Sequence, residues 1–257
     1  MNNPLQQSMT TPDMSVFRVG MPATEFIVHL VDLNKEIETL VLMSYRVTRG
    51  LEDRLPIPRR TDEDAIFQEA LSVARERGVP LWIAVMNAYL ASQTQSSELL
   101  AAAVVHDKSE EKEIELRRDR VTLKEIESLL TNLDPNFALG VSSRVRLHNG
   151  ESRHIPMIDL MCGKSDANVQ TLVRVFRQIG QQRGVLLDSG RSYHYYGLDL
   201  LDERDWLGFM GRSLLLTPLV DTRYLAHRLI DDYGRLRVST SKNKPNMPVV
   251  VDSLRTS

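Results

Sequence analysis

The chain has 257 residues, 42% of them hydrophobic and 26% charged, with a formal net charge of −2 and a single cysteine, Cys162. No apolar run reaches the roughly 18 to 20 residues that a membrane span needs, and one cysteine can form neither an internal disulfide nor a cysteine-based zinc site. These features exclude a transmembrane protein and favour a globular protein of one large or two small domains in a reducing cytoplasm.

The first 92 residues of the chain contain a tail and three regions of predicted helix. Residues 1–15, MNNPLQQSMTTPDMS, have neither a basic start nor an apolar centre, so we expect a flexible tail and no secretory signal. Residues 24–47 mix apolar and charged side chains without a clean period, and we assign them loosely to a helix. A clearer helix is predicted over 62–78, where Asp62 can cap and the apolar positions share one face. Residues 80–92, PLWIAVMNAYLAS, predict a buried helix, with a strand as the alternative.

The next segment is strongly polar. Its charge run HDKSEEKEIELRRDR, within residues 93–120, predicts an exposed surface segment. The best-marked helix follows over 122–133, because Thr122 and Glu125 form a capping box ahead of an apolar stripe. We therefore interpret residues 16–136 as a mainly helical part. It is compatible with a lobe that docks a protein partner, and a plain packing lobe is the simpler interpretation.

The second half of the chain alternates strands with helices. Residues 137–161, FALGVSSRVRL, HNG and ESRHIPMIDLM, predict two strands around an Asn-Gly turn. A helix capped by Asp166 runs to Gly180, and an amphipathic helix is predicted at about 203–216. Since no internal repeat is present, this pattern argues for a sheet domain over 137–257. The expected fold class is α+β, with the helical first half packed on the sheet domain.

Charge is divided unevenly along the sequence. Residues 1–136 hold 15 Lys and Arg against 22 Asp and Glu, whereas residues 137–257 hold 17 against 12. Fourteen of those 17 basic residues are Arg, the side chain best suited to bidentate contact with phosphate. A basic half favours a polyanion or nucleotide partner, and solvated faces that pair with the acidic half are the alternative.

Acidic and histidine side chains occur at the ends or in the middle of several predicted strands. Asp159 ends the apolar strand HIPMIDL, His194 lies on SGRSYHYYG, and Asp221 follows TPLV. An acid at the tail of a buried strand is costly unless it is paired or bound to a cation. Asp159 and Asp221 could hold Mg²⁺ or Mn²⁺, which favour oxygen ligands and share them with substrate phosphates. A downstream basic cluster would then neutralise a triphosphate: Arg235, Arg237, Lys242 and Lys244.

Each of these residues also has a structural interpretation when taken alone. Asp159 could be a strand cap and His194 a hydrogen-bonded core histidine. Asp221 could be a helix N-cap with Arg223 as its ion-pair partner. The candidates gain weight only together.

The strand SGRSYHYYG poses the sharpest question. Its alternation places Ser192, His194 and Tyr196 on one face, and Tyr193 and Tyr195 on the other. Either the histidine is a satisfied core residue, or the strand presents it to a ligand.

Three other chemistries are disfavoured by spacing. CGKS at 162–165 is no phosphate-binding loop, because the required glycine position is occupied by Ile158, although Lys164 at a helix start is a weak anion candidate. The six histidines are scattered with no H-x-x-x-H pair, which argues against a zinc hydrolase. A Ser-His-Asp triad built on Ser189 or Ser192 lacks the G-x-S-x-G elbow.

The order of these pieces resembles the archaeo-eukaryotic primase superfamily over about residues 137–250. That family's pattern is an acidic first motif on a strand, a Ser-x-His second motif and a hydrophobic-Asp third motif, often followed by a basic strand. The matching stretches are HIPMIDL with Asp159, SGRSYHYYG with Ser192 and His194, LVD with Asp221, and LRVSTSK with Arg237, Ser239 and Lys242. The second stretch also looks like the corresponding strand of polymerase domains attached to bacterial end-joining ligases.

The resemblance implies a primase-polymerase-like nucleotidyltransferase that binds a nucleoside triphosphate, Mg²⁺ or Mn²⁺, and a DNA or RNA template. Asp159 and Asp221 would hold the metal and carry catalysis. Contacts to the nucleotide would come from Ser192, His194, Arg237, Ser239 and Lys242. The basic residues assigned to nucleic acid are Arg191, Arg223, Arg235 and Lys244. The corresponding role is in cytoplasmic DNA replication or repair.

The first motif departs from the family pattern. The family usually has two acids on one strand face, whereas the same-face neighbours of Asp159 are Met157 and Met161. The zinc-binding cysteine cluster of many primases is also missing, since Cys162 is alone. The alternative function is therefore a catalytically weakened relative that binds nucleotide and nucleic acid within a larger complex. A third interpretation is an unrelated α/β protein whose acids and histidine are structural.

Overall fold

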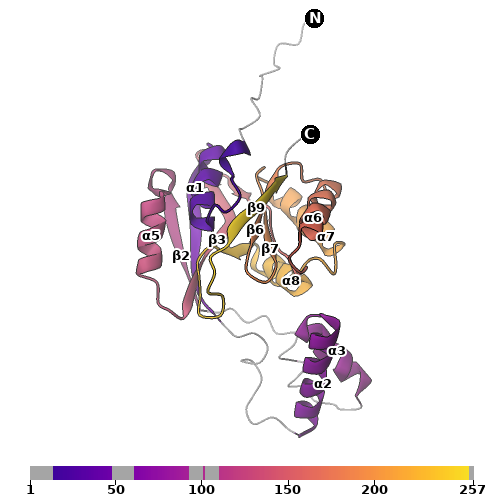
Figure 1. Ribbon diagram of the computed structural model, residues 1–257. Coiled ribbons are helices and arrows are strands. Elements are labelled where there is room, and N and C mark those ends of the chain that lie inside the picture. The colour runs from indigo at the N-terminus through magenta and orange to yellow at the C-terminus, as the bar shows by residue number, and fades with distance from the viewer. Residues whose placement is uncertain (1–13, 48–60, 93–100, 102–109, 255–257) are drawn as a thin grey trace, which may run out of the picture. The chain divides into compact units, whose positions relative to one another are not determined.

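The computed structural model describes residues 14–47, 61–92, 101 and 110–254. The chain divides into two compact units, one of residues 1–46 with 110–257 and one of residues 47–109. These boundaries differ from a division at residue 136, because strands from the first half pair with strands from the second. None of the described helices is both long and apolar enough to span a membrane. The fold is α+β (Figure 1).

Among the described residues of the smaller unit are the helices α2 (Thr61–Arg77) and α3 (Leu81–Ala91). Both helices were predicted, and the strand alternative for residues 80–92 is wrong. The helices pack through a small apolar core of their own, which consists of Ile66, Phe67, Ala70, Ala84, Val85 and Ala88.

In the larger unit, the first antiparallel sheet has the strand order β2-β1-β3-β4, with β8 also paired to β3. Its members are β1 (Ile37–Arg46), β2 (Glu111–Arg117), β3 (Phe137–Leu147), β4 (Ser152–His154) and β8 (Arg235–Arg237). Strand β3 is therefore the strand to which β1, β4 and β8 all bind.

The prediction of a helix over 24–47 is wrong in its second half. Helix α1 (Ala23–Leu33) ends at Leu33, and the strand β1 follows it. Both faces of β1 are covered along part of its length: Leu42 and its neighbour Met43 are both buried, although they point to opposite faces. A strand that is buried on both faces loses the polar-apolar alternation, which explains the missing period.

The charged segment before the capping box was expected to be surface only, and this too needs correction. Part of it forms the edge strand β2, in which Leu116 is buried and Ile114 is partly buried against the central core. The charged side chains alternate with these two and face solvent, for example Glu115, which pairs with Arg146 of β3 at 3.0 Å. Only two apolar positions mark the strand, so the charge run dominated the pattern. The start of the segment, except residue 101, lies outside the described residues.

The second antiparallel sheet has the order β5-β7-β6-β9. Its strands are β5 (Met157–Asp159), β6 (Gly184–Asp188), β7 (Tyr193–Gly197) and β9 (Val249–Leu254). Three helices cover its outer face: α6 (Asp166–Gln178), α7 (Glu203–Leu214) and α8 (Thr222–Asp231) (Figure 1). Its inner face shares a core with the first sheet and α1, in which Phe26, Leu40, Val141 and Val185 are fully buried.

The two faces predicted for SGRSYHYYG are confirmed. Tyr196 lies in the core between the sheets, 4.9 Å from the Phe26 ring centroid. Tyr195 lies on the helix-covered face and stacks on Phe176 with ring centroids 3.7 Å apart. His194 therefore points toward the space between the two sheets.

The predicted hairpin is present, but its second strand is broken. Strand β4 stays paired with β3, whereas β5 joins the second sheet through β7. Pro156 stands at the break, and a proline has no N–H with which to continue a ladder. Because of this break, Asp159 lies in the second sheet although β4, just before it, lies in the first.

The helix caps follow their predicted chemistry with one shift. Thr122 Oγ accepts a 3.2 Å hydrogen bond from the Glu125 N–H at the start of α5 (Leu123–Thr131), as the capping box predicts. At α6 the cap is Ser165, whose Oγ accepts from Asn168 N–H, and Asp166 is the first helical residue instead.

Candidate functional site

Three sequence segments meet at the β5 edge of the second sheet. Asp159 is paired with His194 in the β5–β7 register, and Asp159 Oδ1 lies 3.8 Å from His194 Nε2. The Asp221 N–H donates to the Asp159 carbonyl at 3.3 Å. The structure thus brings together the acids and the histidine that the sequence singled out.

Asp221 is also the N-cap of α8. Its Oδ1 accepts hydrogen bonds from the Arg223 N–H at 2.9 Å and the Tyr224 N–H at 3.0 Å. The structural interpretation of Asp221 as a cap is therefore correct, and it coexists with a place beside Asp159. Arg223 lies in the first turn of the same helix.

Burial drives Asp159 and His194 toward their neutral forms. Desolvation raises the pKa of Asp159 to about 7; the charges of Lys244 and Arg237 oppose this shift, and that of Asp221 adds to it. Burial, together with the cationic Arg237 and Lys244, holds the pKa of His194 well below its usual range. The His194 side chain is 4% exposed, and its Nδ1 has no hydrogen-bond partner among the described residues. His194 is thus not a satisfied core histidine.

Ser192 directly precedes β7 and is also buried. Its hydroxyl lies beside the Cys162 thiol, and this contact partly offsets the burial that raises the thiol pKa. The sequence placed Ser192 as a companion of His194; in the structure its hydroxyl lies at Cys162, which packs against the core under the outer helices.

Arg237 is held by backbone carbonyls. Its guanidinium donates to the carbonyl oxygens of Ser239, of Asn246 at 3.0 Å and of Ser189 at 2.8 Å, and the residue is 7% exposed. These bonds join β8 to the β6–β7 turn and to the loop over 239–246. The two terminal nitrogens of the Arg237 guanidinium, which were expected to contact a nucleotide, thus donate to carbonyl oxygens of the protein.

Ser239 has a similar position. Its Oγ accepts from the Leu139 N–H at 2.9 Å and donates to the Thr240 carbonyl at 2.7 Å, and the side chain is buried. The hydroxyl therefore fixes the end of β8 against β3.

The two lysines of the following turn point to different places. Paired backbone hydrogen bonds of 2.8 and 2.9 Å between Ser241 and Lys244 close the turn. Lys244 is partly buried, burial lowers its pKa, and its charge acts on Asp159 and is itself influenced by Arg191. Lys242 is exposed beside a separate cavity of about 540 Å³. Lys244, which the sequence assigned to nucleic acid, is thus the lysine whose charge lowers the pKa of Asp159.

A layer of tyrosines and arginines lies around the same acid, and sequence reasoning identified only Arg235 among its members. Asp159 contributes to raising the pKa of Tyr45 and of Tyr224, after burial, which is the larger cause. The guanidinium of Arg235 lies 3.9 Å from the Tyr45 ring centroid and pairs with Glu111. Tyr45 was hidden because its segment was assigned to a helix.

Arg228 of α8 completes this layer. Its guanidinium lies 5.8 Å from the Tyr224 ring centroid and 5.7 Å from that of Tyr233, and it pairs with Asp231 at 2.9 Å. The only sequence signal for it is its place in the basic second half.

The donor set fits one divalent cation at most. Asp159 and Asp221 are near enough for each charge to affect the other, and a cation would relieve the cost of their ionisation. Met157, at the position of the expected second acid, is fully buried in the core between the sheets. Within the described ranges, no three His, Cys, Asp or Glu side chains form a group that could hold a metal.

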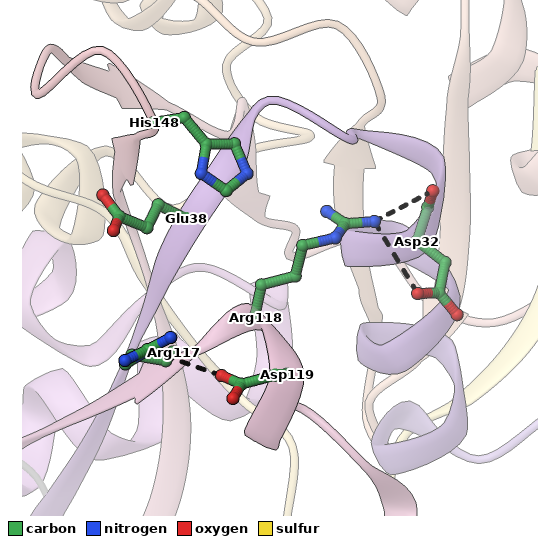
Figure 2. A pocket seen from close by; sticks show the side chains of 6 residues that line it. All are labelled: Asp32, Glu38, Arg117, Arg118, Asp119 and His148. Carbon is green, nitrogen blue, oxygen red and sulfur yellow. Dashed lines mark hydrogen bonds and ion pairs between the residues drawn. The ribbon is translucent and has the colours of Figure 1, made fainter.

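A separate hollow of about 550 Å³ lies at the far end of the first sheet (Figure 2). Six residues line it: Asp32, Glu38, Arg117, Arg118, Asp119 and His148. Its arginines are already engaged: Arg117 pairs with Asp119 at 3.5 Å, and Arg118 donates to the carbonyls of Val31 and Asn34. The Asp159 region is the better candidate site.

Comparison with protein-family models matches residues 118–249 to one family, described as archaeo-eukaryotic primase 1D-like. The chain belongs to this family. The match covers just over half of the chain and includes all of the segments that meet at Asp159. Membership of a primase-like family indicates a function connected with nucleotides or nucleic acids, and the interpretation as an unrelated α/β protein is wrong. No curated protein and no solved structure matches the chain.

Proposed function

We propose that this primase-like protein binds a nucleoside triphosphate beside Asp159 and His194 and transfers its nucleotidyl group to the 3′-hydroxyl of a nucleic-acid strand, with release of pyrophosphate. The observation that carries the proposal is the meeting of Asp159, His194 and Asp221, which come from three separate segments within the family match. A carboxyl group whose pKa burial raises, next to a buried imidazole with an unpartnered nitrogen, is costly in a purely structural site. Ligand binding would explain why the protein retains this pair of Asp159 and His194.

Each residue has a proposed role in this reaction. Asp159 and Asp221 would hold Mg²⁺ or Mn²⁺, which supplies positive charge to the triphosphate when bound. The neutral His194 offers its Nδ1 to a phosphate oxygen or hydroxyl, and Lys244 adds positive charge next to Asp159. The exposed Arg191 would contact the phosphates of a strand.

A second candidate function is binding of nucleotide and nucleic acid without synthesis, as a subunit of a larger complex. A specific observation favours it: the first motif offers a single acid, and Met157 is buried where a second would stand. Two-metal chemistry needs more oxygen ligands than Asp159 and Asp221 supply. A role in cytoplasmic replication or repair is compatible with either function.

Separate measurement of binding and of synthesis distinguishes the two. The protein receives Mg²⁺ or Mn²⁺, nucleoside triphosphates, and primed or unprimed single-stranded DNA or RNA. The informative variant is Asp221→Asn, because asparagine caps a helix as well as aspartate does but carries no charge. The matched control is Asp202→Asn, since Asp202 caps α7 by accepting from the Asp205 N–H at 2.8 Å.

We expect the wild-type protein and Asp202→Asn to extend the strand, and Asp221→Asn to lose extension by about a hundredfold or more. Tight, salt-sensitive binding without extension in either metal would select the second function. Failure to bind either triphosphate or nucleic acid would overturn both.

A further inference from the structure

A series of hydrogen bonds links Glu203 of α7, through His154 and Ser143, to Gly234 before β8. His154 Nε2 is 3.0 Å from Glu203 Oε2, and His154 Nδ1 is 3.2 Å from Ser143 Oγ. Ser143 Oγ in turn accepts from the Gly234 N–H at 2.7 Å. The side chain of His154 is 2% exposed and Ser143 is fully buried, whereas the Glu203 side chain is 57% exposed. The series therefore runs from the surface at α7 to the residue before β8.

The direction of the protons follows from these contacts. Ser143 Oγ already accepts from Gly234, so its own O–H is available to donate to His154 Nδ1. The imidazole then carries its proton on Nε2 and donates it to the Glu203 carboxylate. The neutral Nε2–H form satisfies every member of the series.

These hydrogen bonds connect two segments that lead to site residues. His154 ends β4, and the polypeptide continues through the break at Pro156 to β5 and Asp159. Gly234 directly precedes β8, whose Arg237 ties down the loop that contains Lys244. A Cβ on Gly234 would lie 3.3 Å from Ser143 Cβ, so the two backbones approach closely.

His154 itself is firmly placed. Its N–H and carbonyl both bond to the Leu201 backbone, at 2.7 and 2.8 Å, and its ring stacks on Trp206 with centroids 4.5 Å apart. At the other end, the Ser143 N–H also donates to the Gly234 carbonyl at 2.8 Å, so the hydroxyl link acts in addition to a backbone hydrogen bond.

We propose that His154 is a positioning residue of the nucleotide site: its neutral form supports the Gly234 end of β8 through the Ser143 hydroxyl, in addition to the backbone hydrogen bond there, and its protonation loosens that end. The inference rests on the proposed function for what the site binds. What it adds is a group remote from the ligand that makes ligand binding sensitive to acid.

The charged groups around His154 set the direction of the pH effect. Burial lowers its pKa, the hydrogen bond and charge of Glu203 on α7 oppose this, Arg144 on β3 lowers it further, and Asp232 after α8 raises it. The contribution of neutral His154 is therefore complete above the ordinary histidine pKa and is lost as the pH falls through the lowered value. On protonation, a new N–H at Nδ1 would face the Ser143 hydroxyl, which could no longer donate there. The hydroxyl oxygen would then accept from both His154 and the Gly234 N–H, and its own proton would have no partner in these contacts, which weakens the support of Gly234.

The first test compares two neighbouring buried serines. Ser143→Ala removes the hydroxyl link to His154 and Gly234 and keeps the backbone hydrogen bond to Gly234, whereas in the control Ser142→Ala the lost hydroxyl accepts from the Arg144 N–H, at 3.1 Å. The readouts are hydrogen-exchange protection of the Gly234–Arg237 amides and binding of ATP with Mn²⁺. We expect Ser143→Ala to lower protection and to weaken ATP binding, each by about tenfold, the low end for loss of an outer hydrogen bond at a ligand site. Ser142→Ala should change neither.

The second test uses a response that simple packing would not give. Glu203→Gln keeps an acceptor for Nε2 but removes the charge, so the pH at which Gly234 protection and ATP binding are lost should move downward together. The control is His148→Gln, an exposed histidine on the β3–β4 turn outside this series, whose profile should match the wild type.

The outcomes separate this inference from the proposed function. Unchanged protection in Ser143→Ala, or a Glu203→Gln profile equal to that of the wild type, would overturn the positioning role. Because the Glu203 side chain is largely exposed, its variant carries the test even if Ser143→Ala does not fold. If the wild type binds no ATP while Gly234 protection responds as expected, the proposed function fails and the control of β8 by His154 stands.

Discussion

Asp159 and His194 face each other across the β5–β7 pair, and burial shifts both toward the uncharged state. The carboxylate pKa rises to about 7 and the imidazole pKa falls well below its usual range. With 3.8 Å between Oδ1 and Nε2, the two groups are close enough for an ion pair, yet the pKa shifts oppose one. The pair therefore depends on its surroundings for charge compensation, which is what a ligand site requires.

Replacement of Asp159 by asparagine should stabilise the protein in base and not in acid. The pKa in the folded state, about 7, is above the unfolded value of 3.8. The folded state thus holds the extra proton, and its stabilisation is complete below the unfolded pKa and lost as the pH rises through 7. We expect Asp159→Asn to raise the free energy of unfolding at about pH 8 by roughly 1–2 kcal/mol, a value reduced for the solvent that reaches this side chain. Urea unfolding at about pH 4 and pH 8 measures it, and an equal effect at both would contradict the assigned pKa.

Manganese or magnesium should stabilise the wild-type protein through the same acids. At a concentration tenfold above its Kd, a cation that binds only the folded state adds about 1.4 kcal/mol and raises the melting temperature. Asp159→Asn and Asp221→Asn should each lose this increase, while Asp202→Asn keeps it. Thermal unfolding with and without the metal is the measurement. An equal shift in all four proteins would place the cation elsewhere.

The sequence predicted the position of a site residue where that position depends on its own strand. It did not where the position depends on how distant segments pack. Alternation along β7 correctly put Tyr196 on the face opposite Tyr193 and Tyr195, because side-chain direction in a strand is a local property. The choice between Lys242 and Lys244 was not local. It depends on a tight turn at Ser241, which directs the second lysine toward Asp159.

The fold was predictable for a similar reason and to a similar limit. Helices with one apolar face and a cap, such as α5 with Thr122, were found from their period. Strand β1 was not, since Leu42 and Met43 are buried on opposite faces and leave no period to detect. The transfer of β5 to the second sheet had one local signal, Pro156, whose meaning depends on pairing with β7.

Arg237 should prove essential to stability as well as to the site. Its guanidinium donates to three carbonyl oxygens from separate segments, and Arg237→Met would leave them buried without a donor. We expect a loss of about 3 kcal/mol in the free energy of unfolding. Arg191→Met, at an exposed position of the β6–β7 turn, should change it by less than about 0.5 kcal/mol. Urea unfolding compares the two, and equal losses would show that the carbonyl contacts of Arg237 contribute little.

Gly184 should tolerate no side chain, because it sets the distance between β6 and the stacked aromatic layer behind the site strand. A Cβ there would lie 2.5 Å from the ring and hydroxyl of Tyr195, and that ring is fixed by its stacking on Phe176 at 3.7 Å. Gly184→Ala must therefore shift β6 or displace the ring, at a cost of roughly 2–3 kcal/mol. Gly163→Ala is the matched control, since nothing lies within 4 Å of its added Cβ. Thermal unfolding should show a lower midpoint for Gly184→Ala alone; equal midpoints would mean that the Tyr195 layer can yield, and with it the strand that carries His194.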